Sequence, residues 1–364
     1  MEQAKAFKWA HPVRVAACAP EFMEGFRRFL GPQGFEELGR AMQDSSLLTS
    51  QVVERLTQEG RNPRLKQFIQ ATSHMEAGTE MGNSYAALLY VRQALSPQPY
   101  FLLSDALVEM LEHTDLSDDV PVSSLRLPYP RFYLEMGVSR SVDAYVPNIQ
   151  TGMHRLEGMY CETGTHPDFG EGLYVMLTGS PMGKSGPLDD ATNSIFLPTL
   201  EPTASLPQAL QKSFENSTRL SQAAGLRQSP REFMEHSLHC LNLLAKALLY
   251  ISMPEAKRTN KQELSKALEE LSRKKSSAKQ AKARRALAGM RDYILIEAPI
   301  PDTEPGAGDF VDRKGPRAHW RRGHYRMQVH GEGRQQRKLV FIQPQLIAVQ
   351  ALSESVAAPK YVVR

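Results

Sequence analysis

The fold is decided by the segments RFYLEMGV (131–138), MHRLEGMYCETG (153–164), GLYVMLTG (172–179) and NSIFLPTL (193–200). Each is short, rich in β-branched or aromatic residues and bounded by Gly or Pro, which is typical of strands joined by turns. VPVSSLRLP (120–128) precedes them and has the same character. The sequence therefore predicts a mostly antiparallel sheet between about 120 and 200.

Helical patterns lie on either side of this region in the chain. From Pro20 to about Leu111 apolar residues recur at three- and four-residue spacing, and further helices are predicted at about 206–224 and 230–252. The last helix is apolar around most of its circumference, so we expect it to pack against the sheet. The fold class is α+β, with a helical N-terminal region, a mostly antiparallel sheet with packed helices, and a C-terminal basic β-hairpin module.

Charge divides the chain at Pro254. Before it stand 21 Lys and Arg against 28 Asp and Glu, and from it onward 23 against 12, so the two parts carry −7 and +11. Such an asymmetry indicates a polyanion-facing module attached to an acidic body. We expect an α+β body over 1–253 that recognises a protein or peptide, a basic helix or linker over 254–291, and a basic β module over 292–364.

Several classes of protein and site are excluded. No apolar run reaches the roughly 20 residues needed to span a bilayer, and the first residues lack the apolar core of a secretory signal, so we expect a cytoplasmic protein without membrane contact. Cys18, Cys161 and Cys240 have no CxxC spacing and are expected to be free thiols. GSPMGKSG (179–186) lacks the spacing of a phosphate loop.

Neither a metal nor another cofactor is predicted. Glu235, His236, His239 and Cys240 have offsets that suit a metal on one helix face, but the helix around them is apolar. We interpret them as packed side chains.

The C-terminal stretch AHWRRGHYRMQVHGEGRQQRKLVFIQPQLIAV (318–349) predicts a β-hairpin. Its strands are expected at about 320–330 and 336–349, with a tip at Gly331, Glu332 and Gly333. Before it, DYILIEAP (292–299) predicts a strand and PDTEPGAGD (301–309) a loop.

Basic side chains concentrate on one face of this hairpin. Because side chains alternate across a strand, Arg322, His324, Arg326, Gln328 and His330 should share one face, while Arg321, Tyr325, Met327 and Val329 take the packed one. Glu332 is the one acid between 313 and 338. Guanidinium groups bind phosphate in a bidentate way. The candidate RNA- or phosphate-binding residues are Arg317, Arg321, Arg322, His324, Arg326, Gln328, His330, Arg334, Arg337 and Lys338.

These residues leave three functions open. The first is binding of RNA or another polyanion. The second is metal-independent cleavage of RNA, in which His319 or His324 would act as general acid or base, so whether the protein is an enzyme stays undecided. The third is a structural or protein-binding basic face, as in a stoichiometric inhibitor without RNA contact.

The hairpin also resembles a known family. His319, Arg321, Arg322, Gly323, His324 and Tyr325, followed by Gly331, Gly333 and Pro344, match the H-x-R-R-G-H motif, G-x-G turn and closing Pro of a type V-A anti-CRISPR protein family of phages and plasmids. DLSDDVPVSSLRLPYPRFYLEM (115–136) resembles a second segment of that family, and the apolar helix at about 237–254 has a counterpart there.

The resemblance implies a function for the whole chain. The family member that gives the class its name lowers the amount of the type V-A CRISPR effector nuclease during translation, by recognising its nascent N-terminal peptide and triggering loss of the message. The expected partners are thus a target protein or nascent peptide, together with RNA or the ribosome. The expected outcome is reduced expression of the target.

Overall fold

The computed structural model describes residues 10–44, 47–58, 60, 62–67, 88–93, 95–96, 98–136, 143–148, 152–166, 169–179, 191–199, 201–223, 231–273, 287, 290–299 and 319–347. Its centre is an eight-stranded sheet in the order β7-β6-β5-β3-β1-β9-β8, with β4 paired to β5. The strands are β1 (Tyr100–Leu103), β3 (Arg131–Glu135), β4 (Tyr145–Asn148), β5 (Gly152–His166), β6 (Gly170–Gly179), β7 (Thr192–Pro198), β8 (Lys257–Gln262) and β9 (Asp292–Glu297).

Most of this sheet is antiparallel, as the sequence predicts. The exception is β1, which is parallel to both of its neighbours, β3 and β9. The predicted strands near 131, 153, 172, 193 and 292 are all confirmed. The loop predicted over 301–309 lies outside the described residues.

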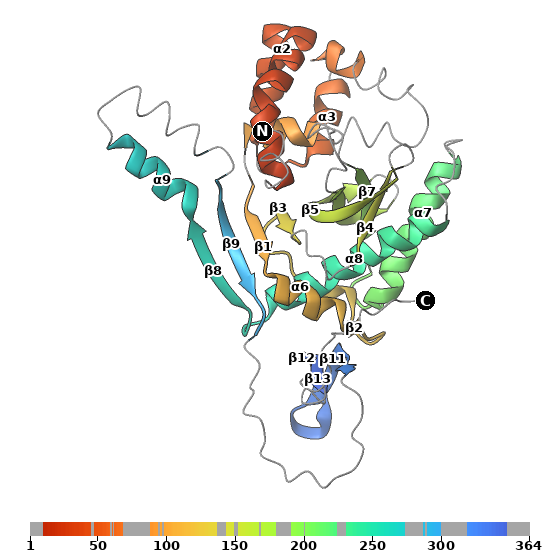
Figure 1. The fold of residues 1–364 in the computed structure, drawn as a ribbon. Coiled ribbons are helices and arrows are strands. Elements are labelled where there is room, and N and C mark those ends of the chain that lie inside the picture. The colour runs from red at the N-terminus through yellow and green to blue at the C-terminus, as the bar shows by residue number, and fades with distance from the viewer. Residues whose placement is uncertain are drawn as a thin grey trace.

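Helices cover both faces of the sheet (Figure 1). One face carries α6 (Asp105–Glu112), α7 (Leu206–Ala223) and α8 (Arg231–Ser252). Phe132 and Leu134 of β3 and Met159 and Cys161 of β5 point to this side and form the main apolar core with α8. The two helices predicted at 206–224 and 230–252 are therefore confirmed, as is the packing of the second against the sheet.

The opposite face is more polar and carries the N-terminal helices α2 (His11–Gln43) and α3 (Thr49–Gln58). Tyr133 and Tyr160 lie there in one cluster with Val15 of α2 and with Leu89 and Tyr90. Arg14 of α2 reaches Glu157 through two hydrogen bonds of 2.9 and 2.7 Å, with both side chains 2% exposed. Buried charges must be paired to be tolerated, so this ion pair fixes the position of α2 on the sheet.

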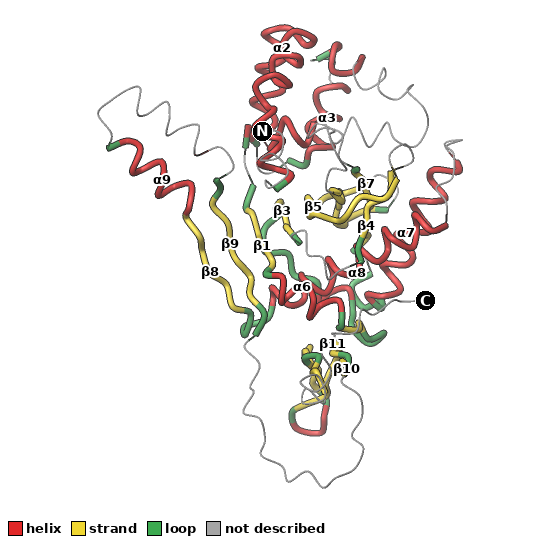
Figure 2. Tube along the Cα trace, viewed as in Figure 1, coloured by secondary structure: helices red, strands yellow, loops and turns green. Residues whose placement is uncertain are grey.

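Three sequence predictions near the sheet are wrong in detail. Residues 120–128 form no strand but contain the short helix η1 (Val122–Ser124), because Pro121 and Pro128 remove ladder donors. β1 lies inside the region predicted to be helical, where a short apolar run is equally compatible with a buried strand. β8 occupies the start of the stretch predicted as basic helix or linker, where no strand is expected, whereas α9 (Glu263–Ser272) confirms a helix in it. Figure 2 shows β8 and β9 side by side at one edge of the sheet.

Near the C-terminus the chain forms two small sheets. β11 (Gly323–His330) and β12 (Gln336–Ile342) are antiparallel, joined by η2 (Glu332–Arg334), and β2 (Thr114–Leu116) adds a third strand. β10 (His319–Arg321) pairs with β13 (Gln345–Ile347). Within the part of the chain that the structure describes, no helix is long and apolar enough to cross a bilayer.

Candidate nucleic-acid interface

The hairpin has the strands and the turn that the sequence predicts. His330 pairs with Gln336 at the tip, and His324 pairs with Ile342 at the base. Gly331 and Gly333 have φ of 78° and 62°, a conformation that side-chain-bearing residues rarely adopt. The Gly-Glu-Gly sequence therefore makes the tight reversal possible.

One face of the hairpin, which we call the basic face, carries the predicted polar row. On β11 it consists of His324, Arg326, Gln328 and His330, and on β12 of Gln336, Lys338, Val340 and Ile342. Arg326, Gln328 and Lys338 are exposed, whereas His324 and His330 are half-buried. Gln336 is exposed as well, so the outer half of the basic face presents two cations and two amides to solvent.

The other face packs on the body, as predicted. Tyr325 is completely buried, stacks on Phe341 at a ring distance of 4.7 Å, and donates its hydroxyl to the carbonyl of Lys246 in α8 at 3.0 Å. Phe341 lies edge-on against Tyr250 at 5.9 Å. Toward the tip this face becomes exposed, since Val329 is 40% accessible. The packing confirms the strand register inferred from the alternation of side chains.

Residues 113–119 hold the base of the hairpin. β2 runs parallel to β11, with Asp115 opposite His324. The Gly323 N–H donates to the His113 carbonyl at 2.9 Å, and the Ser117 N–H donates to the Tyr325 carbonyl at 3.2 Å. The two segments on which the family resemblance rests, one beginning at Asp115 and the other at His319, are thereby brought side by side.

Two aspartates from this segment join the site, and the composition of 313–338 did not reveal them. The Arg322 Nη1 lies 2.6 Å from Asp115 Oδ1, with the side chains 63% and 55% exposed. The Met327 N–H donates to Asp119 Oδ2 at 3.1 Å. The base of the hairpin is therefore not purely cationic, and Arg322 already has an acidic partner.

The remaining candidate residues do not share a single surface. Arg337 lies opposite Val329 and so on the packed side, where it is exposed near the tip. Arg334 is exposed in the turn and has a positive φ of 56°. Arg321 is exposed in β10. Arg317 and the side chain of His319 lie outside the described part of the structure.

Catalysis requires an acid and a base close to one phosphate. His324 and His330 share the basic face but are six residues apart on one strand, which corresponds to about 20 Å at roughly 3.3 Å per residue. These two histidines are therefore too far apart to act on one phosphodiester.

Behind the hairpin lies a buried lysine that sequence reasoning missed. Lys246 Nζ donates to the carbonyls of Leu111 at 2.7 Å and Thr114 at 2.9 Å, which joins α8 to the end of α6 and to β2. Burial lowers its pKa to about 8, although the carboxylates of Glu112 and Asp115 oppose that shift. A lone lysine inside an apolar helix gave no sequence signal, because its role depends on carbonyls distant in the chain.

Of the four side chains interpreted as packed rather than metal-binding, Cys240 is buried and His236 and His239 are half-buried, whereas Glu235 is exposed and pairs with Arg231 at 3.0 Å. His239 Nε2 lies 3.3 Å from Glu112 Oε1. Cys240 is buried with its Sγ 3.4 Å from the Tyr145 carbonyl, and burial raises its pKa to about 12. Cys161 is also a buried free thiol. In the described ranges, no group of three or more His, Cys, Asp or Glu side chains is placed to hold a metal ion.

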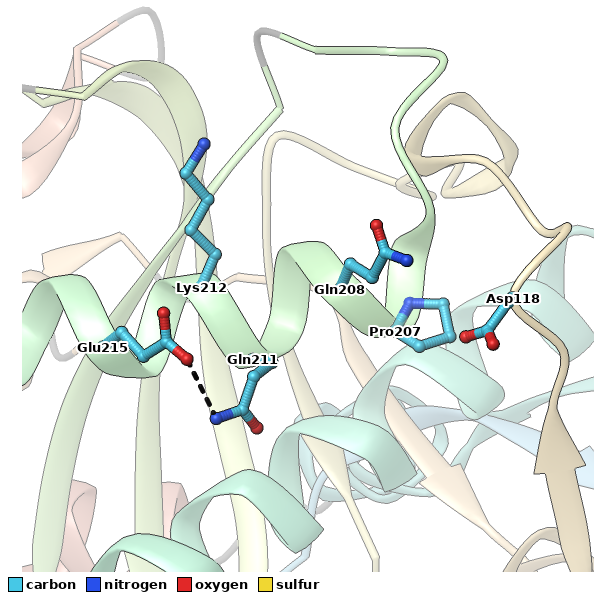
Figure 3. A pocket seen from close by; sticks show the side chains of 6 residues that line it. All are labelled: Asp118, Pro207, Gln208, Gln211, Lys212 and Glu215. Carbon is cyan, nitrogen blue, oxygen red and sulfur yellow. Dashed lines mark hydrogen bonds between the residues drawn. The ribbon is translucent and has the colours of Figure 1, made fainter.

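A shallow cavity lies beside the aspartate segment, between it and α7 (Figure 3). Its walls are Asp118, Pro207, Gln208, Gln211, Lys212 and Glu215, and Gln211 donates to Glu215 at 3.3 Å. The charges are mixed, and this lining contains no Ser, Cys, His or aromatic side chain. The cavity therefore offers less to an anionic ligand than the basic face.

The chain was compared with curated proteins, solved structures and family profiles, and the family profile agrees with the resemblance seen in the motifs. Among curated proteins none matches this chain. Among solved structures, a crystal structure of AcrVA2 aligns with 92% of this chain and 99% of its own, at 14% sequence identity and a TM-score of 0.43. The sequence profile of the AcrVA2-like family, described as anti-CRISPR type V subtype A2, matches residues 101–349. This match spans more than half of the chain and includes both segments that meet at the base of the hairpin, so the chain belongs to the AcrVA2-like family of anti-CRISPR proteins.

Proposed function

We propose that this chain lowers the amount of a type V-A CRISPR effector nuclease by recognising the effector polypeptide during translation, while its basic face contacts the RNA or the ribosome. Membership in an anti-CRISPR family supports a CRISPR effector as the target. The acidic body over 1–253 provides most of the surface for a polypeptide partner. The hairpin within 292–364 provides the contact with RNA, whereas β8 of 254–291 and β9 of 292–364 belong to the main sheet.

One observation carries the RNA contact: Arg326, Gln328 and Lys338 lie exposed on one face of a hairpin that is anchored to the body through Tyr325. A rigid strand holds such side chains at fixed spacing. The backbone that carries them therefore loses little conformational entropy on binding. Guanidinium and ammonium groups bind phosphates irrespective of base sequence. The contact would therefore suit any message that carries the target peptide.

The test is RNA binding by the whole chain, because β8 and β9 belong to the main sheet and cannot be cut from it cleanly. Fluorescence anisotropy with a labelled single-stranded RNA should show affinity falling steeply between about 50 and 200 mM salt. Arg326→Gln and Lys338→Gln should each weaken binding and reduce the log–log salt slope by about 0.7. Arg231→Gln, which removes an 89% exposed cation on α8, is the matched control and should change neither.

A binding affinity that is independent of salt, or equal losses in the Arg231 control, would remove the polyanion contact from the proposal. The translation-coupled part is tested separately. Pull-down of the tagged protein from translating cells, followed by sequencing of the associated RNA, should enrich the message of the effector.

A further inference from the structure

β12 forms an open edge of the three-stranded sheet. The order of that sheet is β12-β11-β2, so β12 and the three-residue β2 are its two edge strands. In the described part of the chain, β12 has β11 as its one strand partner, and none of the hydrogen bonds found between elements reaches its main chain. Among the described residues, nothing therefore occupies its outer N–H and C=O groups.

The hydrogen bonds of β11 identify these outer groups. The N–H groups of Gly323 and Met327 and the carbonyl of Tyr325 all point toward the β2 side. Even-numbered residues of β11 must therefore bond to β12, and their partners across the ladder are the even-numbered residues of β12. Arg337, Leu339 and Phe341 consequently direct their N–H and C=O groups outward.

The inner part of this edge lacks the protection that natural edge strands usually carry. Leu339, Val340, Phe341 and Ile342 are half-buried and contain neither a charge nor a proline. β8, which shares the edges of the main sheet with β7, differs from β12. Its Lys257 pairs with Glu297 at 3.1 Å, and its Arg258 donates to the Ile251 and Met253 carbonyls at the end of α8. Of β8 and β12, β12 is the strand whose outward main-chain groups lie among apolar side chains and without a charged side chain bound to them.

Charge at the tip end of β12 indicates what this edge accepts. Arg334, Arg337 and Lys338 are exposed there, against the one acid Glu332 in the turn. A second copy would gain nothing from these cations, because an antiparallel pair centred on Leu339 places Arg337 opposite Phe341 of the other molecule. An extended segment with an acidic end would match both the charge and the apolar run.

We infer that β12 binds an extended segment of a partner polypeptide as an added strand, with β-branched or apolar residues beside Leu339–Ile342 and an acidic residue beside Arg337. Main-chain hydrogen bonds supply affinity in this mode of recognition, and the alternating side chains supply selectivity. The inference rests on the proposed function in one respect: the partner is the target polypeptide whose recognition that function requires. It adds to the acidic body a second contact for that polypeptide, on the hairpin.

Residue-resolved amide hydrogen exchange of the full-length protein tests this docking directly. The probe is the synthetic peptide acetyl-Thr-Val-Thr-Val-Thr-Glu-Glu-amide. It is used at about 1 mM, so that binding with a dissociation constant of about 1 mM or less is detected. It should slow exchange of the outward amides of Arg337, Leu339 and Phe341, while the inward amides of Lys338 and Val340 are already slow. The same peptide with Lys-Lys in place of Glu-Glu should protect them at least tenfold less.

Three results would overturn the inference. Unchanged exchange with the Glu-Glu peptide means that the edge does not accept a strand. Protection of the outward amides in the free protein that grows with concentration means that a second copy occupies the edge. Protection that is independent of concentration means that another segment of this chain already covers it.

Two variants at one position connect the edge to function. Arg337→Gln removes the cation, and Arg337→Pro removes both the cation and the outward N–H, which an edge strand tolerates. In cells that express the effector, Arg337→Pro should lose the reduction of effector level, and Arg337→Gln should lose only part of it. Equal activity of both variants and wild type overturns the edge as a docking site, whereas a wild type that leaves the effector level unchanged contradicts the proposed function itself.

Discussion

Asp115 and Arg322 are 207 positions apart in the chain, yet their side chains form a 2.6 Å ion pair where β2 meets β11. This contact connects the body to the hairpin at the point where the candidate RNA-binding surface begins. Asp115 therefore stands where an incoming phosphate would meet Arg322.

Asp115→Asn should leave the fold intact, because exposed ion pairs contribute at most about 1 kcal/mol. RNA affinity should rise by less than about tenfold, since the substitution removes a negative charge from the edge of the basic face. Anisotropy titrations of the two proteins measure the change. Asp118→Asn, a neighbouring substitution that leaves Arg322 paired, is the control; a rise of the same size there would show that Asp115 has no specific role.

Tyr325 provides a second prediction, on stability. Tyr325→Phe keeps the ring against Phe341 and loses one buried hydrogen bond, so it should cost about 0.5–1.5 kcal/mol in the free energy of unfolding. Tyr325→Ala should cost about 3–5 kcal/mol, because it also leaves a cavity. Arg326→Ala on the exposed face should change stability by only about 0.5 kcal/mol. Urea denaturation distinguishes the three, and a silent Tyr325→Ala would mean that the hairpin is not docked on α8.

Lys246 predicts a pH dependence of stability. Its pKa is about 8 in the folded protein, lowered by burial from an ordinary 10.5, so between these values the unfolded chain binds more proton than the folded one. The free energy of unfolding should therefore rise with pH over that range. Urea midpoints measured at several pH values should show that the stability of wild type rises relative to that of Lys246→Met between about pH 8 and 10.5. If the difference in urea midpoint between the two proteins does not change with pH, Lys246 does not titrate in this range.

The purified protein should leave RNA intact. His324 and His330 are about 20 Å apart along β11, which separates them beyond the reach of concerted acid–base chemistry. The side chain of His319, the other candidate, lies outside the described part of the structure, so this prediction extends to it without a distance. Labelled RNA incubated in buffer with chelator is therefore expected to survive, and degradation should appear only when a cell lysate supplies a nuclease. Cleavage in buffer that His324→Gln abolishes at unchanged RNA affinity would contradict this and make the chain the nuclease.

The hairpin was predictable from sequence because its information is local. Side chains alternate between the two faces of a strand, which places Tyr325 and Arg326 on opposite faces. The Gly-Glu-Gly sequence locates the turn between the strands. The Arg322 partner was not predictable in this way, since no local pattern connects residue 322 to residue 115. The role of Lys246 was not predictable for the same reason, because its partners are main-chain carbonyls of α6 and β2.

Strands without a pattern of their own were also missed. β1 has four residues, nearly all buried, and such a run fits a helix as well as a strand. β8 is polar along most of its length because it lies at an edge, so it carries no apolar alternation. In both cases the strand is determined by its neighbour in the sheet, β9, which follows in sequence only at residue 292.

The position of β9 between β1 and β8 has a consequence for how the molecule is made. On a translating ribosome, β1 and β3 emerge early, but the strand that covers the open side of β1 is not available until residue 297 has left the exit tunnel. Until then Phe101 and Leu103 border an unpaired edge, a state prone to wrong pairing. Chains that end near residue 253 should therefore aggregate, whereas chains extended past residue 297 should be soluble.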